Sequence, residues 1–184
     1  ISYNHNNRTM VAYSGINYGL NIDGVNKTVR LTDGGTQRLR IDNDGIKFGT
    51  DSAAANALDD YEEGTWTPQL TNGSSNIGTT VGNASYTKIG RLVHLECQIA
   101  RNDSSSDGNI MQVSGLPFAH VNNPAVVGAA WLDNTSSDIR CFLYLPSGNT
   151  SMYFIKTGAS SAYVSLNEFD NGRFIYLGLT YNTA

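Results

Sequence analysis

The sequence predicts an all-β protein, and three of its features support this prediction. Most of the chain consists of short runs in which apolar and polar residues alternate, the pattern of a strand with one buried face. Clusters of Gly, Asn, Asp and Ser separate these runs and are typical of tight turns. Only the Ala-rich stretch 53–58 has the composition of a helix. We therefore expect antiparallel sheets with little helix.

Residues 1–50 predict short strands that cannot bury their own apolar surface. The units 19–24, 29–34, 39–45 and 46–49 each place two apolar residues at positions i and i+2, before a turn that contains Asp, Asn or Gly. Strands this short, with one narrow apolar face, are marginally stable alone. We therefore expect identical chains, wound around a common axis, to cover that face.

Residues 51–64 predict a short helical neck followed by an acidic junction. Asp51 or Ser52 can cap a helix, and residues 53–58 have high helix propensity. So short a helix is unstable in isolation. Two interpretations stay open: a turn on the surface, or a neck where three copies meet through small side chains. The acidic residues of the junction are Asp59, Asp60, Glu62 and Glu63.

Residues 65–184 predict an antiparallel β-sandwich with jelly-roll-like connections. Nine alternating runs separated by turn residues fit such a fold. The last run has apolar residues on both faces, so we expect it to be buried between two layers. The runs are 65–71, 84–88, 91–101, 109–114, 125–132, 139–145, 151–157, 162–166 and 173–181.

Composition narrows the possible partners. The 184 residues have a formal net charge of -4, and charged residues make up 15% of the chain, against an average of about 25%. The 12 basic residues are scattered, so we expect no nucleic acid partner. No apolar stretch is long enough to span a membrane and no leader opens the chain, so we expect no membrane insertion. The chain begins at Ile1 rather than Met, so we expect a fragment or a processed product.

No residues form a recognisable catalytic or metal-binding pattern. Cys97 and Cys141 lie in alternating runs among apolar residues, and we expect buried free thiols. His5, His94 and His120 are far apart and lack the spacing of zinc ligands. The adjacent carboxylates of the acidic junction do not offer the fixed separation that glycoside hydrolysis needs. We therefore predict no enzyme, no cofactor and no metal site; for the acidic cluster we expect a structural role, with a cation on the assembly axis as the alternative.

The residues around the acidic junction resemble a known family. Residues 53–68, AAANALDDYEEGTWTP, are similar to a recurrent junction in bacteriophage tail-fibre and related virion proteins, where a repetitive shaft gives way to a C-terminal β-sandwich. Residues 86–93 and 110–118 resemble the body of that terminal domain, so the similarity spans roughly residues 38–120. The resemblance implies a homotrimer that contacts the host cell surface. It implies no particular receptor and no particular binding residue.

The predicted architecture therefore has three parts. Residues 1–50 form a β-rich, intertwined trimeric shaft, residues 51–64 a short helical neck and junction, and residues 65–184 a jelly-roll-like head. The chain changes character across residues 41–70 because upstream strands depend on neighbouring chains, whereas the head buries its own core.

The loops of the head predict a receptor surface. If successive strands alternate in direction, the loops with consecutive serines lie far from the shaft: 72–83, 102–108, 133–138 and 158–161. The loops with Pro and Phe then face the shaft: 89–90, 115–124, 146–150 and 167–172. Exposed Ser, Asn and Asp supply adaptable hydrogen bonds, and aromatic rings supply contact area. The predicted receptor-binding residues are Asn76, Asn102, Asp103, Ser105, Asp107, Trp131, Asp133, Asn134, Ser136, Ser160 and Tyr163.

Both tryptophans have a structural alternative. Trp131 ends an alternating run, where a tryptophan belongs to the core more often than to a binding surface, so both assignments stay open. Trp66 lies beside the junction, and we expect it in the core or between chains.

We expect the distal part of a phage tail fibre, which trimerises and binds a host cell-surface receptor for adsorption. The neutral surface favours a glycan or the loops of an outer-membrane protein over a charged ligand. The other expected partner is the remainder of the virion tail, and the expected location is the virion, extracellular after release. Two alternatives stay open: a depolymerase that degrades host glycan, and a purely structural decoration of the virion.

Overall fold

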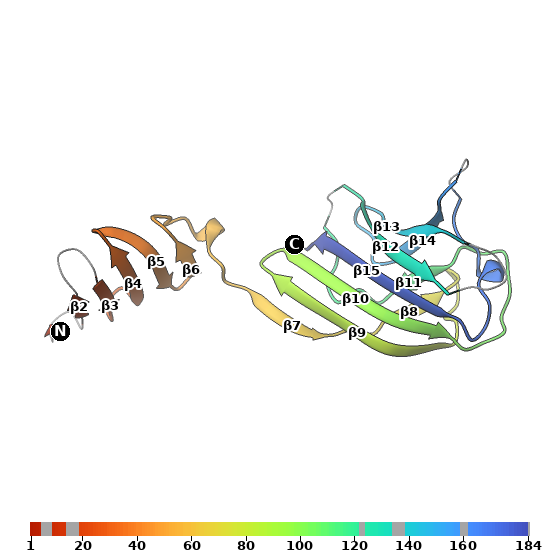
Figure 1. Ribbon diagram of the computed structural model, residues 1–184, viewed down its shortest axis with the longest axis horizontal. Coiled ribbons are helices and arrows are strands. Elements are labelled where there is room, and N and C mark those ends of the chain that lie inside the picture. The colour runs from red at the N-terminus through yellow and green to blue at the C-terminus, as the bar shows by residue number, and fades with distance from the viewer. Residues whose placement is uncertain (5–8, 14–18, 122–123, 134–138, 159–161, 184) are drawn as a thin grey trace. The chain divides into compact units, whose positions relative to one another are not determined.

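The structure is a computed structural model of the chain that describes all residues except 5–8, 14–18, 122–123, 134–138, 159–161 and 184. The described residues form two antiparallel sheets and contain no α-helix, so the all-β prediction is confirmed (Figure 1). The chain divides into two compact units, Ile1–Tyr61 and Glu62–Ala184. Within the described residues, no helix has the length and apolar character that crossing a membrane requires.

The first unit is a six-stranded meander in which each strand pairs with the next along the chain. Aspartate turns connect its strands: the Asp23 side chain accepts hydrogen bonds from the backbone N–H groups of Val25 and Asn26, both at 3.0 Å. The strands are β1 (Ser2–Asn4), β2 (Thr9–Tyr13), β3 (Gly19–Asp23), β4 (Thr28–Asp33), β5 (Thr36–Asp42) and β6 (Gly45–Phe48).

The register of this sheet gathers its apolar side chains on one face. Directly paired residues of antiparallel strands share a face. The apolar pairs are Met10↔Ile22, Ala12↔Leu20, Leu20↔Leu31, Ile22↔Val29, Val29↔Ile41, Leu31↔Leu39, Leu39↔Phe48 and Ile41↔Ile46. Phe48 is 64% exposed, and every buried apolar side chain among the described residues belongs to the second unit. The first unit therefore has an apolar face and no core of its own.

The predicted helical neck is wrong, because the segment contains only one turn of 3₁₀ helix, η1 (Ala54–Asn56). Asp51 accepts a hydrogen bond from the Asn56 side chain at 2.7 Å, which closes this turn. Leu58 then exchanges two backbone hydrogen bonds with Ile46, at 2.8 and 3.0 Å. This pairing with β6 holds the following residues in an extended conformation, so the helix cannot continue.

The second unit is one continuous sheet of nine strands that curls into a half-barrel. Its order is β7-β9-β10-β15-β12-β13-β14-β11-β8, so the two edge strands, β7 and β8, are neighbours in the sequence. The strands are β7 (Tyr61–Thr65), β8 (Gln69–Thr71), β9 (Thr79–Ile89), β10 (Leu92–Arg101), β11 (Gln112–Ser114), β12 (Val126–Leu132), β13 (Cys141–Leu145), β14 (Met152–Lys156) and β15 (Phe174–Asn182).

Four predicted runs differ from the observed strands. The run 84–88 is part of the longer β9, so residues 79–83 of the predicted loop 72–83 are strand, and only the last three residues of the run 109–114 form β11. The run 65–71 is interrupted at residues 66–68, where Pro68 has no N–H to donate and the chain passes from one edge of the sheet to the other. The run 162–166 forms only isolated bridges and then turns into η2 (Leu166–Glu168). A capping box between Ser165 and Glu168 stabilises that turn.

The core lies on the inner face of the curl. Alternate residues of β10 and β15 point into it, and large side chains such as Leu143, Met152, Phe154 and Tyr181 fill it. The prediction that the run 173–181 is buried on both faces is wrong, because its outward side chains are exposed. A single curled sheet encloses one core and leaves its outer face open.

The turn between β9 and β10 defines one end of the sheet, the Gly90 end, and the C-terminus of β10 defines the other, the Arg101 end. Loops 72–78 and 102–111 both lie at the Arg101 end, where Asn102 N–H donates to the Gly78 carbonyl at 2.9 Å. The predicted location of loop 167–172 is wrong. Gly172 N–H donates to the Arg101 carbonyl at 2.8 Å, because the miscounted run 162–166 turns back before it crosses the sheet.

Candidate functional site

Arg101 is buried at the end of β10 and connects three segments of the chain. Its guanidinium donates to the carbonyl of Leu166 at 3.0 Å and to the carbonyl of Phe169. Its Nε lies 3.5 Å from Asp103 Oδ1. Burying a charge is costly unless polar partners surround it. The two carbonyls and the carboxylate supply those partners, and they attach the η2 turn to β10.

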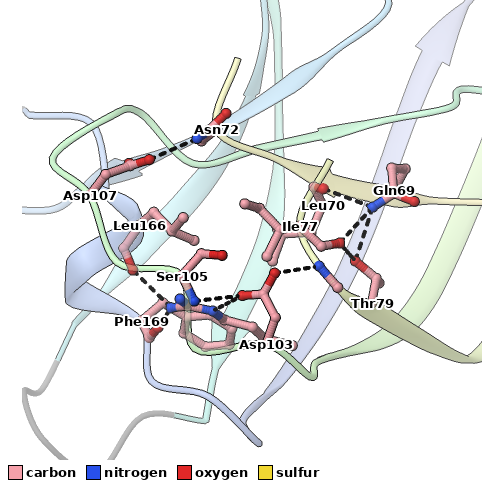
Figure 2. A network of polar contacts seen from close by, with 12 residues as sticks. Gln69, Leu70, Asn72, Ile77, Thr79, Asp103, Ser105, Asp107, Leu166 and Phe169 are labelled. Atoms are coloured by element: carbon pink, nitrogen blue, oxygen red, sulfur yellow. Dashed lines mark hydrogen bonds and ion pairs between the residues drawn. The ribbon is translucent and has the colours of Figure 1, made fainter. Parts of the chain in front are cut away.

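Asp103 joins the two loops of the Arg101 end (Figure 2). Its Oδ2 accepts a hydrogen bond from Gly78 N–H at 2.7 Å, and its Oδ1 accepts one from Ser105 N–H at 3.1 Å. Burial opposes ionisation of this carboxyl, but the two N–H donors and the Arg101 guanidinium outweigh it and lower the pKa of Asp103. Asp103 therefore holds the two loops together.

Asp107 acts in the same way on the outer side of the loop. Its Oδ1 accepts a hydrogen bond from Asn109 N–H at 2.9 Å, and its Oδ2 accepts one from the Asn72 side chain at 2.7 Å. These two donors lower the pKa of Asp107. The Asp107 carbonyl also accepts a hydrogen bond from Asn167 N–H at 2.9 Å. Two predicted receptor-binding residues are thus parts of the loop scaffold.

The other predicted receptor-binding residues divide by environment. Asn76, Asn102 and Ser105 are exposed at the Arg101 end. Asp133 is half-buried, and its backbone N–H donates to the Phe174 carbonyl at 2.9 Å. The exposed ring of Tyr163 packs against Tyr153, 5.5 Å between ring centroids. Three lie outside the described residues: Asn134, Ser136 and Ser160.

The two tryptophans have opposite environments. Trp66 is buried, and its indole N–H donates to the Glu96 carbonyl at 3.2 Å. Trp131 is 62% exposed on the outer face of β12, so its assignment to the core is wrong and its role in receptor binding stays a prediction. Its ring stacks on Tyr176 of β15, with 5.1 Å between centroids and an interplanar angle of 21°.

A groove of about 520 Å³ lies beside this aromatic pair on the outer face of the sheet. Cross-strand register places Glu96, Gly178 and Ala129 in one row across β10, β15 and β12. The next row holds Gln98, Tyr176 and Trp131, and Gln98 Nε2 donates to the Tyr176 hydroxyl at 3.2 Å. The groove is lined by Asn83, Glu96, Cys97, Gln98, Ala129, Ala130, Trp131, Tyr176, Leu177 and Gly178.

Sequence reasoning found Trp131 but missed the rest of this groove. Tyr176 was assigned to the interior, and Asn83 stands beside a β-bulge that alternation alone does not reveal. Between the pairs Cys97↔Ala84 and Ile99↔Val81, β9 contains one residue more than β10. One sequence feature could have indicated the groove: Tyr176 and Gly178 are two positions apart, so they lie on the same face of a strand that has apolar residues on both faces.

The remaining candidates are the histidines and the carboxylates of the acidic junction. Within the described residues, no three His, Cys, Asp or Glu side chains gather so that they could hold a metal ion. Glu62 and Glu63 are adjacent in β7, so their side chains point to opposite faces of the strand. His94 bonds Thr180 at 2.9 Å on the outer face, whereas His5 lies outside the described residues.

Both cysteines are free, as predicted from their apolar neighbours; Cys97 is buried and Cys141 half-buried. Burial raises the pKa of Cys97 to about 12 and that of Cys141 to about 11. Neither thiol therefore forms the reactive thiolate readily at neutral pH.

No protein-family model, no curated protein and no solved structure matches this chain.

Proposed function

We propose that the chain is the distal part of a bacteriophage tail fibre, in which three copies assemble and present their heads to a receptor on the host cell. The main support is the contrast between the two units. The first has an apolar face and no core, whereas the second encloses a core of its own. An apolar face without a core is expected of a shaft that is stable only as an assembly. A unit that encloses its own core is expected of a head that folds by itself.

Assembly follows from the energetics of the exposed face. Burying apolar surface contributes about 25 cal/mol per Å², and a large apolar patch on an isolated chain favours association. Three copies of the first unit, wound around one axis, would each cover the apolar face of a neighbour. The short strands and the junction residues 53–68 agree with a trimeric shaft.

The head is proposed as a jelly-roll-like β-sandwich that binds its receptor at the Arg101 end and the adjoining outer face. The backbone N–H of Trp66 donates to the Ala84 carbonyl, and a Cβ at Gly64 would meet the Tyr86 ring. Because later residues of the β7 segment lie beside earlier residues of β9, the two strands are antiparallel and β7 begins at the Gly90 end. The predicted receptor-binding residues of loops 72–78 and 102–111 lie at the opposite end of the unit. That is the location that a surface directed toward a host cell requires.

The test has two measurements on the full 184-residue chain. Light scattering should give a molar mass three times the 19.9 kDa of one chain. Saturating protein should then slow adsorption of the parent phage to its host, because it occupies the receptor. A stable monomer argues against the shaft, and unaffected adsorption argues against receptor binding and for a structural decoration.

A third measurement addresses the depolymerase alternative. The protein is incubated with purified host polysaccharide, and the reducing ends released are counted. The proposal expects none above the level of a heat-denatured sample. Release of oligosaccharide would replace binding by glycan cleavage.

A further inference from the structure

We propose that the groove beside Trp131 binds an uncharged oligosaccharide. This inference rests on the proposed function, because it names the chemical class of the receptor and the site that takes it. Within the proposed receptor surface, it assigns the sugar site to the outer face of β10, β15 and β12 rather than to the serine-containing loops. Four observations support it: the floor of the groove, its aromatic wall, its polar groups and its charge.

The floor is open because of residue choice. A Cβ built on Gly178 would meet only the Leu95 carbonyl oxygen, at 3.9 Å, which is ordinary contact distance. The backbone of Gly178 is also outside the left-handed region, so a larger residue would fit there without strain. Ala129 is the adjacent small residue of the same row. Together they leave room for a ligand on a sheet face where neighbouring rows carry full side chains.

The aromatic wall offers a stacking surface. Trp131 and Tyr176 lie nearly parallel, and Phe174 extends the series with its ring centroid 6.3 Å from that of Tyr176. Gln98 fixes the Tyr176 ring through a hydrogen bond to its hydroxyl. Large, rigid aromatic side chains that stay exposed on a soluble domain mark binding surfaces. The apolar C–H face of a pyranose ring matches such a surface in size and flatness.

The polar groups are those that bind hydroxyl groups. The amides of Asn83 and Gln98 each offer donors and acceptors, and the Glu96 side chain adds acceptors. The bulge in β9 opposes Gln98 with an extra residue, and bulges commonly redirect a side chain beside a functional site. Ser85 donates to Glu96 Oε1 at 3.3 Å and orients it.

The charge of the groove selects a neutral ligand that is bound and not cleaved. Among the described residues that line the groove, Glu96 is the one charged side chain. The negative charge of this carboxylate disfavours phosphate, sulfate and carboxylate groups on the ligand. A lone carboxylate also lacks the second carboxyl group of a glycoside hydrolase.

The experiment uses the full chain on an array of oligosaccharides from bacterial lipopolysaccharides, capsules and teichoic acids. We expect neutral oligosaccharides to be retained and phosphorylated ones to be passed over. Gly178→Val fills the floor and should weaken binding at least about tenfold, as should Trp131→Ala, which removes a stacking ring. Val127→Ser is the matched control, since Val127 is exposed on the same face of β12 but does not line the groove. It should retain parental binding.

Circular dichroism and light scattering verify that each variant keeps the fold and the assembly. A second measurement does not depend on substituted protein. In chain labelled with 5-fluorotryptophan, the two resonances of Trp66 and Trp131 are assigned through Trp131→Phe. The oligosaccharide should shift the Trp131 resonance and leave that of buried Trp66 in place.

The outcomes separate this inference from the proposed function. If adsorption is blocked but no oligosaccharide binds, the receptor is a protein, so the groove assignment is wrong while receptor binding stands. If Gly178→Val binds oligosaccharide as tightly as the unsubstituted chain does, the sugar site lies elsewhere. The groove assignment is then wrong, while receptor binding stands. If Trp131 is shielded from solvent in the ligand-free assembly, a second copy covers the groove and the inference fails. If adsorption is unaffected but the groove binds sugar, the inference stands and the proposed function fails.

Discussion

Asp103 Oδ2 accepts a hydrogen bond from the backbone N–H of Gly78 at 2.7 Å, and this contact joins two loops that are 25 residues apart in the sequence. Through Oδ1 the same carboxylate holds Ser105 N–H and faces Arg101. The loops of the Arg101 end are therefore organised by polar contacts within the chain. Such organisation reduces the entropy that a binding surface loses when it takes a partner.

Replacing Asp103 by Ala should lower the free energy of unfolding of the second unit by about 1–3 kcal/mol, because the Gly78 N–H loses its acceptor. Asp103→Asn is the matched control; it keeps an acceptor oxygen and should lose less. Urea denaturation followed by tryptophan fluorescence measures both, since both tryptophans lie in this unit. A change for Asp103→Ala within about 0.5 kcal/mol, the range of ordinary surface substitutions, would contradict the assignment.

The stability of the second unit should fall at acid pH through its three carboxyl groups whose pKa values are lowered in the folded state: Asp103, Asp107 and Glu168. Each is stabilised in its ionised form, so its contribution is full above the unfolded pKa, about 4. The contribution is lost as the pH falls through the lower folded pKa. Urea midpoints from pH 7 to pH 2 should drop below about pH 4, and this drop should shrink in Asp103→Asn. An unchanged profile in that variant would assign the acid sensitivity to other groups.

Both thiols should react slowly in the native protein. Burial raises the pKa of Cys97 to about 12 and that of Cys141 to about 11, so the thiolate fraction at pH 8 is small. Ellman's reagent should modify Cys97 only after unfolding, and half-buried Cys141 before Cys97. In guanidinium chloride both should react rapidly, which provides the control. Fast modification of Cys97 in native protein would show that the core around β10 opens.

Assembly into the proposed trimer should depend on the apolar face of the first unit. Leu31 and Leu39 are paired across β4 and β5 on that face, and replacing both by Ser should shift the molar mass from trimer toward monomer. Arg30→Gln, on the opposite face of β4, is the control and should remain trimeric. Analytical ultracentrifugation measures both. A trimer that survives the double substitution would place the contact between copies elsewhere.

Gly45→Ala should open the pairing of Ile46 with Leu58. Gly45 has a φ of +122°, and a Cβ there would lie 2.6 Å from the Leu58 carbonyl oxygen, so the junction strand must move away. Gly34→Ala is the control for a positive φ, because Gly34 has a φ of +58° but no atom lies within 4 Å of its Cβ position. Hydrogen exchange should accelerate at the Leu58 amide in Gly45→Ala alone. Equal acceleration in both would attribute the effect to backbone strain.

Much of the strand content could be predicted from local pattern. The runs around β10, β13, β14 and β15 alternate because one face of each meets the core, and their predicted bounds agree with the observed strands to within two residues. The run 162–166 looked equivalent, but its capping box turns the chain into η2. One miscounted strand then reversed the predicted location of loop 167–172.

The candidate site was less predictable, because it is a property of strand pairing. Trp131 and Tyr176 are 45 positions apart in the sequence and meet only through the register of β12 with β15. The same register brings Glu96 and Gly178 together. Alternation indicates that Tyr176 lies opposite the core residues of its strand, but whether that outer face is covered depends on how the whole sheet curls.

The sequence by itself determined where most strands of the core form, that the first fifty residues lack a core, and that the character of the chain changes at the acidic junction, because these follow from local periodicity and composition. Only the tertiary structure decided that Asp103 and Asp107 hold loops together, that Trp131 is exposed, and that a groove lies beside it. Those features depend on which strands become neighbours, and that choice is made by the burial of one shared core rather than by any local segment.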